Sequence, residues 1–300
     1  MYNTQGTAPS DRNVSLRIRC RGKRIDTDAF EGHRISPHGL FPASTMNRKG
    51  IFMKLQQVLS YVRRAVDDYH MIRPGDRIAV GISGGKDSLT LLYALHALKR
   101  FYPAPFELVA VTVDLGFHNL DLSGIETICR DELQIPYHIV RTDIADIVFH
   151  RRQESNPCAL CAKMRKGALN EAVKKEGCNK VAYAHHRDDV VETMLMSLIY
   201  EGRFHTFAPV TWLDRMELTV IRPLLYLNEP DIIGFVNRAH IPVVKSPCPA
   251  DGHTRREYVK GLLRQLNLEN PGVKERMFTA IVNSGLQGWQ TGAARPDGRI

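Results

Sequence analysis

The chain has 300 residues, a formal net charge of +9 and 43% hydrophobic residues, which is ordinary for a globular protein with one large or two small domains. No apolar run approaches the roughly twenty residues of a membrane-spanning helix, and the first thirty residues lack the apolar stretch of a secretory signal. Membrane and secreted proteins are both disfavoured. We therefore expect a cytoplasmic protein with no membrane partner.

The positive charge is concentrated in residues 1–52, which hold nine Lys and Arg against four Asp and Glu. This segment is rich in Gly, Pro, Ser and Thr and lacks sustained periodicity, so it is interpreted as a disordered basic extension. A translational start assigned too early, with the true start at Met53, would also explain it. Residues 53–285 are expected to form one domain with C-terminal helices, and residues 286–300 a flexible tail.

From Met53 onward, strand-like apolar runs alternate with amphipathic helical patterns. Helices are expected at about 53–69, 122–133, 157–176, 188–200, 229–240, 254–266 and 272–283. A further helix is expected directly after the first strand. Strands are expected at 77–82, 108–113, 137–141, 180–184 and 218–221, and a further extended run at 243–244. This alternation predicts an α/β fold, a doubly wound parallel sheet with helices on both faces, whose ligands bind at the carboxyl ends of the strands.

The most informative motif is residues 80–88, Val-Gly-Ile-Ser-Gly-Gly-Lys-Asp-Ser, between the first strand and a helix. Glycines let backbone N–H groups approach a polyphosphate, the helix N-terminus adds a favourable dipole, and Lys86 adds a charge. The spacing fits neither the Walker loop nor the Rossmann fingerprint. It resembles the Ser-Gly-Gly-x-Asp-Ser loop of ATP pyrophosphatases, which split ATP between the α- and β-phosphates. A plain glycine turn is the alternative.

A cysteine pair forms the second motif. Cys158 and Cys161 lie three apart in the first turn of a predicted helix, where the helix dipole favours thiolates, and Arg165 projects from the same side. A zinc ribbon would need a second pair, and a thioredoxin-type motif would directly follow a strand. If the loop of Cys248 opens onto the same crevice, three thiolates converge. Three thiolates on a four-iron cluster leave one iron open to a non-protein ligand.

Residues 184–189, Ala-His-His-Arg-Asp-Asp, follow the fourth predicted strand, so a parallel sheet places them near the phosphate loop. Either aspartate could hold Mg²⁺ on nucleotide phosphates. Asp188 is interpreted as the helix cap and Asp189 as the functional residue. The two histidines are expected to pack or to contact the nucleotide, because adjacent residues rarely point at one ion.

Together with Arg222-Pro223-Leu224, these motifs make residues 53–283 resemble the TtcA family of tRNA 2-thiocytidine synthetases, within the PP-loop ATP pyrophosphatase superfamily. The resemblance implies an adenine nucleotide α-hydrolase-like fold. It also implies ATP- and Mg²⁺-dependent thiolation of a cytidine in the tRNA anticodon loop, by a homodimer with a [4Fe-4S] cluster. Adenylation of the cytosine C2 oxygen would release pyrophosphate, and sulfur supplied by sulfide or a cysteine desulfurase would then displace AMP.

The motifs and the resemblance together give a set of expected site residues. The ATP-binding residues would be Ser83, Gly84, Gly85, Lys86, Asp87, Ser88, Asp114 and His185. The catalytic residues would be Lys86, Arg165 and Asp189. The ligands of the cluster would be Cys158, Cys161 and Cys248.

The loop of the third cysteine departs from this family. Relatives often carry a Cys-x-x-Cys-Gly-Ser-type run there, whereas residues 248–252 read Cys-Pro-Ala-Asp-Gly. One alternative function is another PP-loop ligase, such as a tRNA lysidine synthetase-like enzyme, which leaves Cys158 and Cys161 without a role. A second is a non-catalytic iron–sulfur sensor or RNA-binding module.

Basic residues on the predicted helix at 254–266 are candidates for contact with tRNA phosphates. They are Arg255, Arg256, Lys260 and Arg264. A solvated helix face explains such a cluster equally well.

Overall fold

The computed structural model describes residues 48–117, 120–152, 157–245, 247–249 and 254–292. The prediction for the basic extension therefore lies outside the described residues up to residue 47. Helix α1 (Arg48–Asp68) begins before the predicted start at residue 53. No helix in the described part of the chain combines the length and apolarity needed to cross a membrane.

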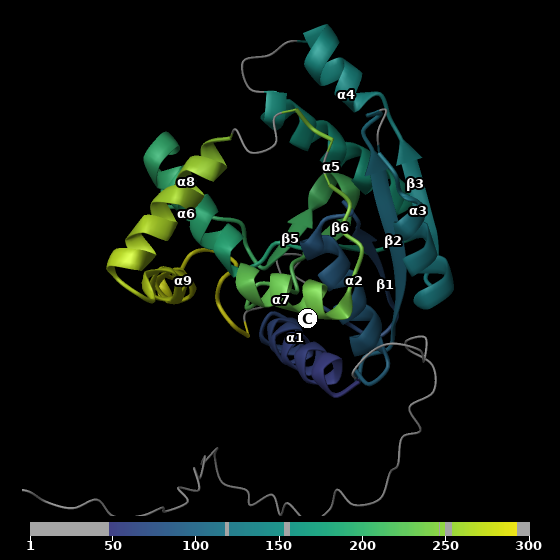
Figure 1. The fold of residues 1–300 in the computed structure, drawn as a ribbon, viewed down its shortest axis with the longest axis horizontal. Helices are drawn as coiled ribbons and strands as arrows, with labels where there is room; N and C mark the ends of the chain where they lie inside the picture. Colours follow the sequence, from purple (N-terminus) through teal and green to yellow (C-terminus); the bar gives the residue numbers. More distant parts are fainter. Residues whose placement is uncertain (1–47, 118–119, 153–156, 246, 250–253, 293–300) are drawn as a thin grey trace, which may run out of the picture. The chain divides into compact units, whose positions relative to one another are not determined.

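The centre of the fold is a six-stranded sheet with the order β3-β2-β1-β4-β6-β5 (Figure 1). The strands are β1 (Asp76–Gly81), β2 (Phe106–Asp114), β3 (Tyr137–Arg141), β4 (Lys180–Ala182), β5 (Val210–Leu213) and β6 (Leu218–Ile221). All pairs are parallel except β5 with β6, which is antiparallel. The predicted doubly wound parallel sheet is confirmed. The antiparallel edge strand β5 was not predicted.

The strand order reverses direction at β1. The chain runs from β1 outward to β2 and β3, then crosses back to β4 and β6 on the other side. In such sheets the crevice at the carboxyl ends of the two central strands is the usual ligand site. The phosphate-loop motif follows β1 and the His-His-Arg-Asp-Asp segment follows β4, so both meet at this crevice.

The longer helices agree with the predicted ranges within a few residues. They are α2 (Lys86–Lys99), α5 (Pro157–Lys175), α6 (Arg187–Glu201), α7 (Glu229–Ala239), α8 (Arg255–Glu269) and α9 (Val273–Asn283). The predicted helix at 122–133 is α3 (Ser123–Thr127) continued by a π-helical turn, Ile128–Glu132. A short helix α4 (Ile144–Asp146) with a second π-helical turn, Ile147–Arg152, was not predicted, nor was the 3₁₀ turn Asp214–Met216.

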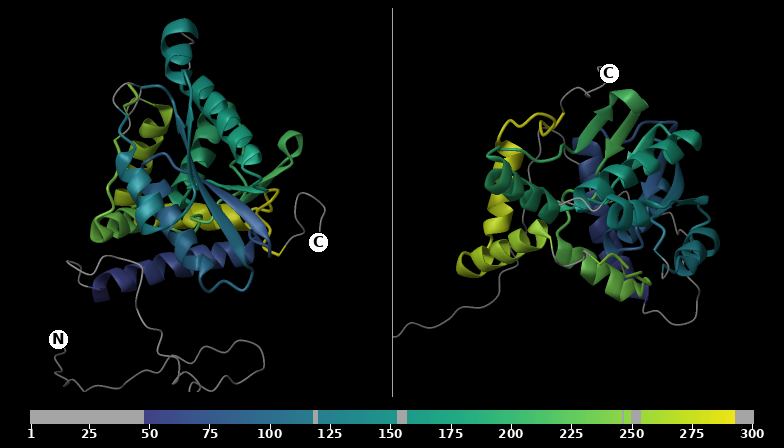
Figure 2. Two further views of the ribbon diagram at one scale, coloured as in Figure 1. Left: turned by 90° about the vertical axis from the view of Figure 1, so that its right-hand side faces the viewer. Right: turned by 90° about the horizontal axis from the view of Figure 1, so that it is seen from above.

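Alternate strand residues build two cores, one on each face of the sheet, because successive side chains of a strand point to opposite faces. Ile78 and Val80 of β1 belong to a core shared with α1, α2 and α7. Ala79, between them, packs in a second core with Leu169 and Val173 of α5. Figure 2 shows α5 on the other side of the sheet from α1. Helices α6, α8 and α9 pack together beside the sheet.

The C-terminal segment is packed as far as Trp289. Its indole is 1% exposed and meets the rings of Tyr69 and Phe278 edge-on, with centroids 6.2 and 5.9 Å apart. Burial of a large aromatic ring fixes the backbone that carries it. Trp289, within the segment predicted to be a flexible tail, is therefore packed against the core, and residues 293–300 lie outside the described part.

Candidate active site

The phosphate-loop motif folds into a preformed turn at the carboxyl end of β1. The Ser88 hydroxyl accepts hydrogen bonds from the Ser83 backbone N–H and hydroxyl, both at 3.2 Å, and donates to the Gly85 carbonyl at 2.9 Å. Gly84 has φ +79°, a conformation that favours glycine. Backbone N–H groups held in this way at the start of α2 form a concave anion site.

A segment far along the chain closes on this turn. The Val244 N–H donates to the Gly84 carbonyl at 3.0 Å, and a Cβ added to Gly84 would stand 2.9 Å from the Val244 Cβ. The extended run predicted at 243–244 is therefore not a strand of the sheet, because its backbone pairs with the loop instead. This contact brings the segment that leads to Cys248 against the phosphate loop.

Lys86 lies at the first position of α2 between two carboxylates. Its Nζ is 3.0 Å from Asp87 Oδ2 and 3.0 Å from Glu229 Oε1. Burial would lower the pKa of Lys86, but the two carboxylates outweigh it and raise the pKa, so the ammonium group is charged. Glu229 is a site residue that the motif analysis missed, because only the fold brings the start of α7 to the loop.

Of the two aspartates after β4, Asp189 and not Asp188 takes part in the cap of α6. Helix α6 is capped at His186, whose backbone N–H donates to Asp189 Oδ2 at 3.0 Å, so Asp189 closes the capping box. Asp188 instead accepts from the Glu229 N–H at 2.8 Å and from Lys274 Nζ at 2.6 Å. The interpretation of Asp188 as the cap is wrong, since its position on the first turn faces α7 and α9.

Two carboxylates at this edge could share a cation. His186 Nε2 lies 3.8 Å from Asp87 Oδ1 and 3.4 Å from Asp189 Oδ2. Asp87 Oδ1 is buried and accepts no hydrogen bond from the described residues. Mg²⁺ takes few carboxylates together with phosphate oxygens, so this pair beside an anion site fits the ion.

Burial and the neighbouring Arg222 keep the His185 imidazole neutral. The Arg222 Nε–H donates to His185 Nδ1 at 3.3 Å, while its Nη1 donates to the Ala208 carbonyl at 2.6 Å. Burial first, and Arg222 second, lower the pKa of His185 to about 3. Since Nδ1 is the acceptor, the proton is on Nε2. The ring of Phe207 stacks at 4.7 Å and supports this orientation.

Helix α8 turns two of its basic residues toward the site. Arg256 Nη1 lies 3.1 Å from Glu192 Oε2 and 3.5 Å from Asp189 Oδ1. Lys260 Nζ lies 3.6 Å from Glu229 Oε1. The basic residues of this helix are therefore not one solvated face.

The other two basic residues of α8 are exposed, and they differ in their surroundings. Arg255 lies over the Tyr200 ring, with 4.9 Å from its guanidinium carbon to the ring centroid. Arg264 is exposed as well. Arg255 and Arg264 are therefore the members of the predicted cluster that point to solvent.

The cysteine pair lies at the start of α5, as predicted. Cys158 is exposed, and Cys161 and Cys248 are half-buried. Burial raises the pKa of Cys161, nearby Arg165 lowers it, and the charges of Cys248 and Cys158 raise it further. The thiols of Cys158 and Cys248 are therefore close enough to Cys161 to influence its ionisation.

These thiols are not arranged around one ion. Among the described residues, no three His, Cys, Asp or Glu side chains stand close enough to hold a metal ion together. An iron–sulfur cluster is larger than an ion and takes one cysteine per iron, so its ligands stand farther apart. The all-thiol donor set fits such a cluster.

Asp114 ends β2, next to the phosphate loop in the sheet. Its Oδ1 accepts from the Gly116 N–H at 2.9 Å, in a turn where Gly116 has φ +85°. The carboxylate is thereby held at the carboxyl edge of the sheet, on the β2 side of the loop. This is where a nucleotide bound in the crevice would extend.

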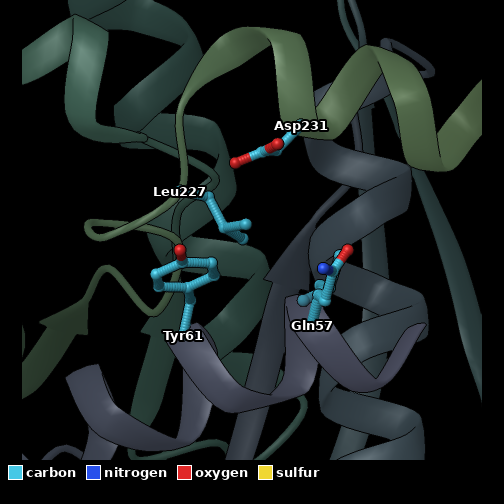
Figure 3. A pocket seen from close by; sticks show the side chains of 5 residues that line it. Gln57, Tyr61, Leu227 and Asp231 are labelled. Atoms are coloured by element: carbon cyan, nitrogen blue, oxygen red, sulfur yellow. The ribbon is translucent and has the colours of Figure 1, made fainter. Parts of the chain in front are cut away.

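One pocket lies apart from these residues. It has a volume of about 100 Å³ between α1 and the start of α7 (Figure 3). It is lined by Gln57, Val58, Tyr61, Leu227 and Asp231. None of the predicted site residues lines it.

The loop, the crevice and the strand order define a class of protein. Residues 54–266 match the PP-loop domain family, so the chain belongs to the PP-loop proteins. The predicted superfamily is confirmed.

Within that class, the chain belongs to the family of tRNA-cytidine(32) 2-sulfurtransferases. It is 41% identical to the one from Geobacter sulfurreducens over 234 residues, which is 77% of this chain and 91% of the relative. It is 39% identical to the one from Geobacter metallireducens over 233 residues, 77% of this chain and 90% of the relative.

A solved structure shares the fold. The U34-tRNA thiolase NcsA from Methanococcus maripaludis, determined with its [4Fe-4S] cluster, superposes with a TM-score of 0.65. The two are 24% identical in sequence, and the match covers 78% of this chain and 79% of NcsA.

Proposed function

We propose that the protein is an ATP-dependent tRNA sulfurtransferase that replaces the C2 oxygen of an anticodon-loop cytidine with sulfur. The hydrogen bond from Val244 to Gly84 carries the proposal, because it joins the segment of Cys248 to the phosphate loop. This contact supports a single crevice for nucleotide and sulfur chemistry. The names of the relatives support the same activity.

The phosphate loop supplies the activation step. The N–H groups of Ser83–Ser88 and the Lys86 ammonium would bind the ATP phosphates, and Asp87 and Asp189 would hold Mg²⁺, which would offset the phosphate charge. The cytosine C2 oxygen attacks the α-phosphorus, and pyrophosphate leaves with the electron pair of the broken P–O bond. Lys86 and the loop stabilise the charge that develops on pyrophosphate. Adenylation turns a poor leaving oxygen into a good one.

The cysteines supply the sulfur side of the site. Cys158, Cys161 and Cys248 would be the ligands of a [4Fe-4S] cluster, and Arg165, which lowers the pKa of Cys161, would stabilise negative charge beside it. When bound, a cluster with three cysteine ligands offers one iron without a protein ligand, where inorganic sulfur can bind. AMP leaves when sulfur takes the place of the activated oxygen.

The crevice walls orient the nucleotide in this proposal. His185 presents its Nε2–H as a hydrogen-bond donor because Arg222 fixes its tautomer. Asp114 would face the nucleotide from the end of β2. The expected sulfur donor is sulfide or a cysteine desulfurase, and the expected form is a cytoplasmic homodimer, as the family resemblance implies.

Nucleoside mass spectrometry tests the proposal. We expect tRNA from a strain deleted for this gene to lack 2-thiocytidine, and the wild-type gene to restore it. A gene encoding Lys86→Ala should not restore it. Unchanged 2-thiocytidine in the deletion strain would contradict the proposed substrate. An iron-free, colourless preparation with full activity would favour a PP-loop ligase instead.

A further inference from the structure

One carboxylate links the phosphate-loop lysine to a lysine of α8. Glu229 Oε1 lies 3.0 Å from Lys86 Nζ and 3.6 Å from Lys260 Nζ. The three residues come from the starts of α2 and α7 and from α8, which lie far apart in the sequence. Because both ammonium groups approach the same oxygen, the distance between the two Nζ atoms is at most the sum of these two distances.

Lys86 also pairs with a second carboxylate, that of Asp87, whereas Lys260 is ion-paired with the shared carboxylate of Glu229. Lys86 and Glu229 are both charged, since each shifts the pKa of the other toward the ionised form against the effect of burial. Glu229 offers one negative charge, and both lysines approach only its Oε1. A polyphosphate has more negative charge and more acceptor oxygens, so it can accept from both ammonium groups at once.

The backbone of Glu229 is fixed by hydrogen bonds, whereas its carboxylate is held by ion pairs with two lysines. Its N–H donates to Asp188 Oδ2 at 2.8 Å, and Asp188 is held by Lys274. The side chain of Glu229 remains 27% exposed, so its carboxylate can move toward solvent without unwinding α7.

We propose that Lys260 is a second phosphate-binding cation of the nucleotide site, and that the Glu229 carboxylate occupies the phosphate position until a nucleotide displaces it. The inference rests on the proposed function, since it takes ATP to bind at the Ser83–Ser88 loop. It assigns α8 to the nucleotide site. Arg264, exposed on the same helix, has no such contact among the described residues and stays available to RNA.

Binding measurements separate these roles. Isothermal titration of the full-length protein should show that Lys260→Gln weakens ATP and pyrophosphate binding about tenfold, as expected for one lost charge-assisted contact. AMP and tRNA affinities should not change. Lys260→Arg should restore most of the ATP affinity. Arg264→Gln removes the same charge from the same helix, and it should leave ATP and pyrophosphate affinities at the wild-type value.

A second variant tests whether the Glu229 carboxylate occupies the phosphate position. Glu229→Gln should keep or tighten pyrophosphate binding, because a neutral amide competes less well for the lysines. Weaker pyrophosphate binding in Glu229→Gln would show that phosphate does not displace the Glu229 carboxylate from the lysines. If Lys260→Gln binds ATP and pyrophosphate as tightly as the wild type, Lys260 does not bind phosphate. This conclusion holds whether or not tRNA binding or thermal stability falls.

The outcome for the proposed function is separate. Wild-type protein that binds ATP through Lys260 but thiolates no cytidine would defeat the proposed function and leave this inference in place. Wild-type protein that binds neither ATP nor pyrophosphate would overturn both.

Discussion

The phosphate loop and the cysteine region differ in how they are held. The loop is cross-linked by its own hydrogen bonds between Ser83, Gly85 and Ser88, and Val244 closes on it from outside. The cysteines depend on one helix start and one coil, with Cys158 exposed at the surface. A preformed anion site needs little reorganisation to bind. We expect the thiols, in contrast, to reach their final positions only when a ligand holds them together.

The difference extends to charge. Around the loop, ion pairs join α2, α6, α7 and α8 through Lys86, Arg256 and Lys260. Around the cysteines, the described residues include one basic neighbour of Cys161, Arg165. We therefore expect changes in one region to leave the other intact, and the first two predictions test this separation.

The largest effect is expected at the sulfur side. Cys161→Ser should reduce thiolation to background, because serine replaces a soft ligand and even outer-shell changes cost about 10–100-fold at metal sites. Bound iron should fall with it, while ATP affinity stays unchanged. Iron analysis and nucleoside mass spectrometry measure both. Ala162→Ser, on the same helix turn, is the control, and full iron content in Cys161→Ser would refute the ligand assignment.

The converse change is at the phosphate side. Lys86→Ala should slow ATP-dependent adenylation about 10²–10³-fold, as loss of one preorganised charge-stabilising group does. Iron content should match the wild type. Pyrophosphate release in the presence of tRNA gives the rate, and Lys163→Ala on α5 is the charge-matched control. A rate within about twofold of wild type would exclude Lys86 from catalysis.

Two glycine substitutions test the contact between the phosphate loop and Val244, which leads to the cysteine region. Gly84→Ala should lower the free energy of unfolding by about 1–3 kcal/mol, because Gly84 has positive φ and its new Cβ would meet Val244. Gly167→Ala, with open space around it within α5, should raise it by about 0.5–1 kcal/mol. Urea unfolding measures both. Equal effects of the two substitutions would show that the Val244 contact does not constrain the loop.

The last prediction is a pH dependence of stability. The pKa of His185 is lowered to about 3 in the folded protein, so below about pH 6.5 the unfolded chain binds a proton that the folded chain does not. Stability should therefore fall with decreasing pH, by at most about 1.4 kcal/mol per pH unit from this group. His185→Gln should remove that part of the slope in urea unfolding at several pH values. Parallel slopes for wild type and variant would show that His185 is not held neutral.

Local sequence determined much of this protein. The phosphate loop, the Cys-x-x-Cys helix start and the alternation of strands and helices are encoded within about ten to twenty neighbouring residues, so periodicity and capping predict them. The interpretation of Asp188 as the helix cap was wrong, and the contact of the 243–244 run with the phosphate loop was not predicted, for the opposite reason. Each depends on which distant backbone lies opposite, and a local pattern carries no such information.

Tertiary structure alone decided how the site is assembled. It turned Arg256 and Lys260 inward, brought Glu229 between two lysines and placed Arg222 on His185. It also buried Trp289 in a segment that reads as a tail. These pairs are separated by tens of residues in the chain. Only the packing of α7, α8 and the strand edges determines which side chains share a low-dielectric crevice, where opposite charges must meet.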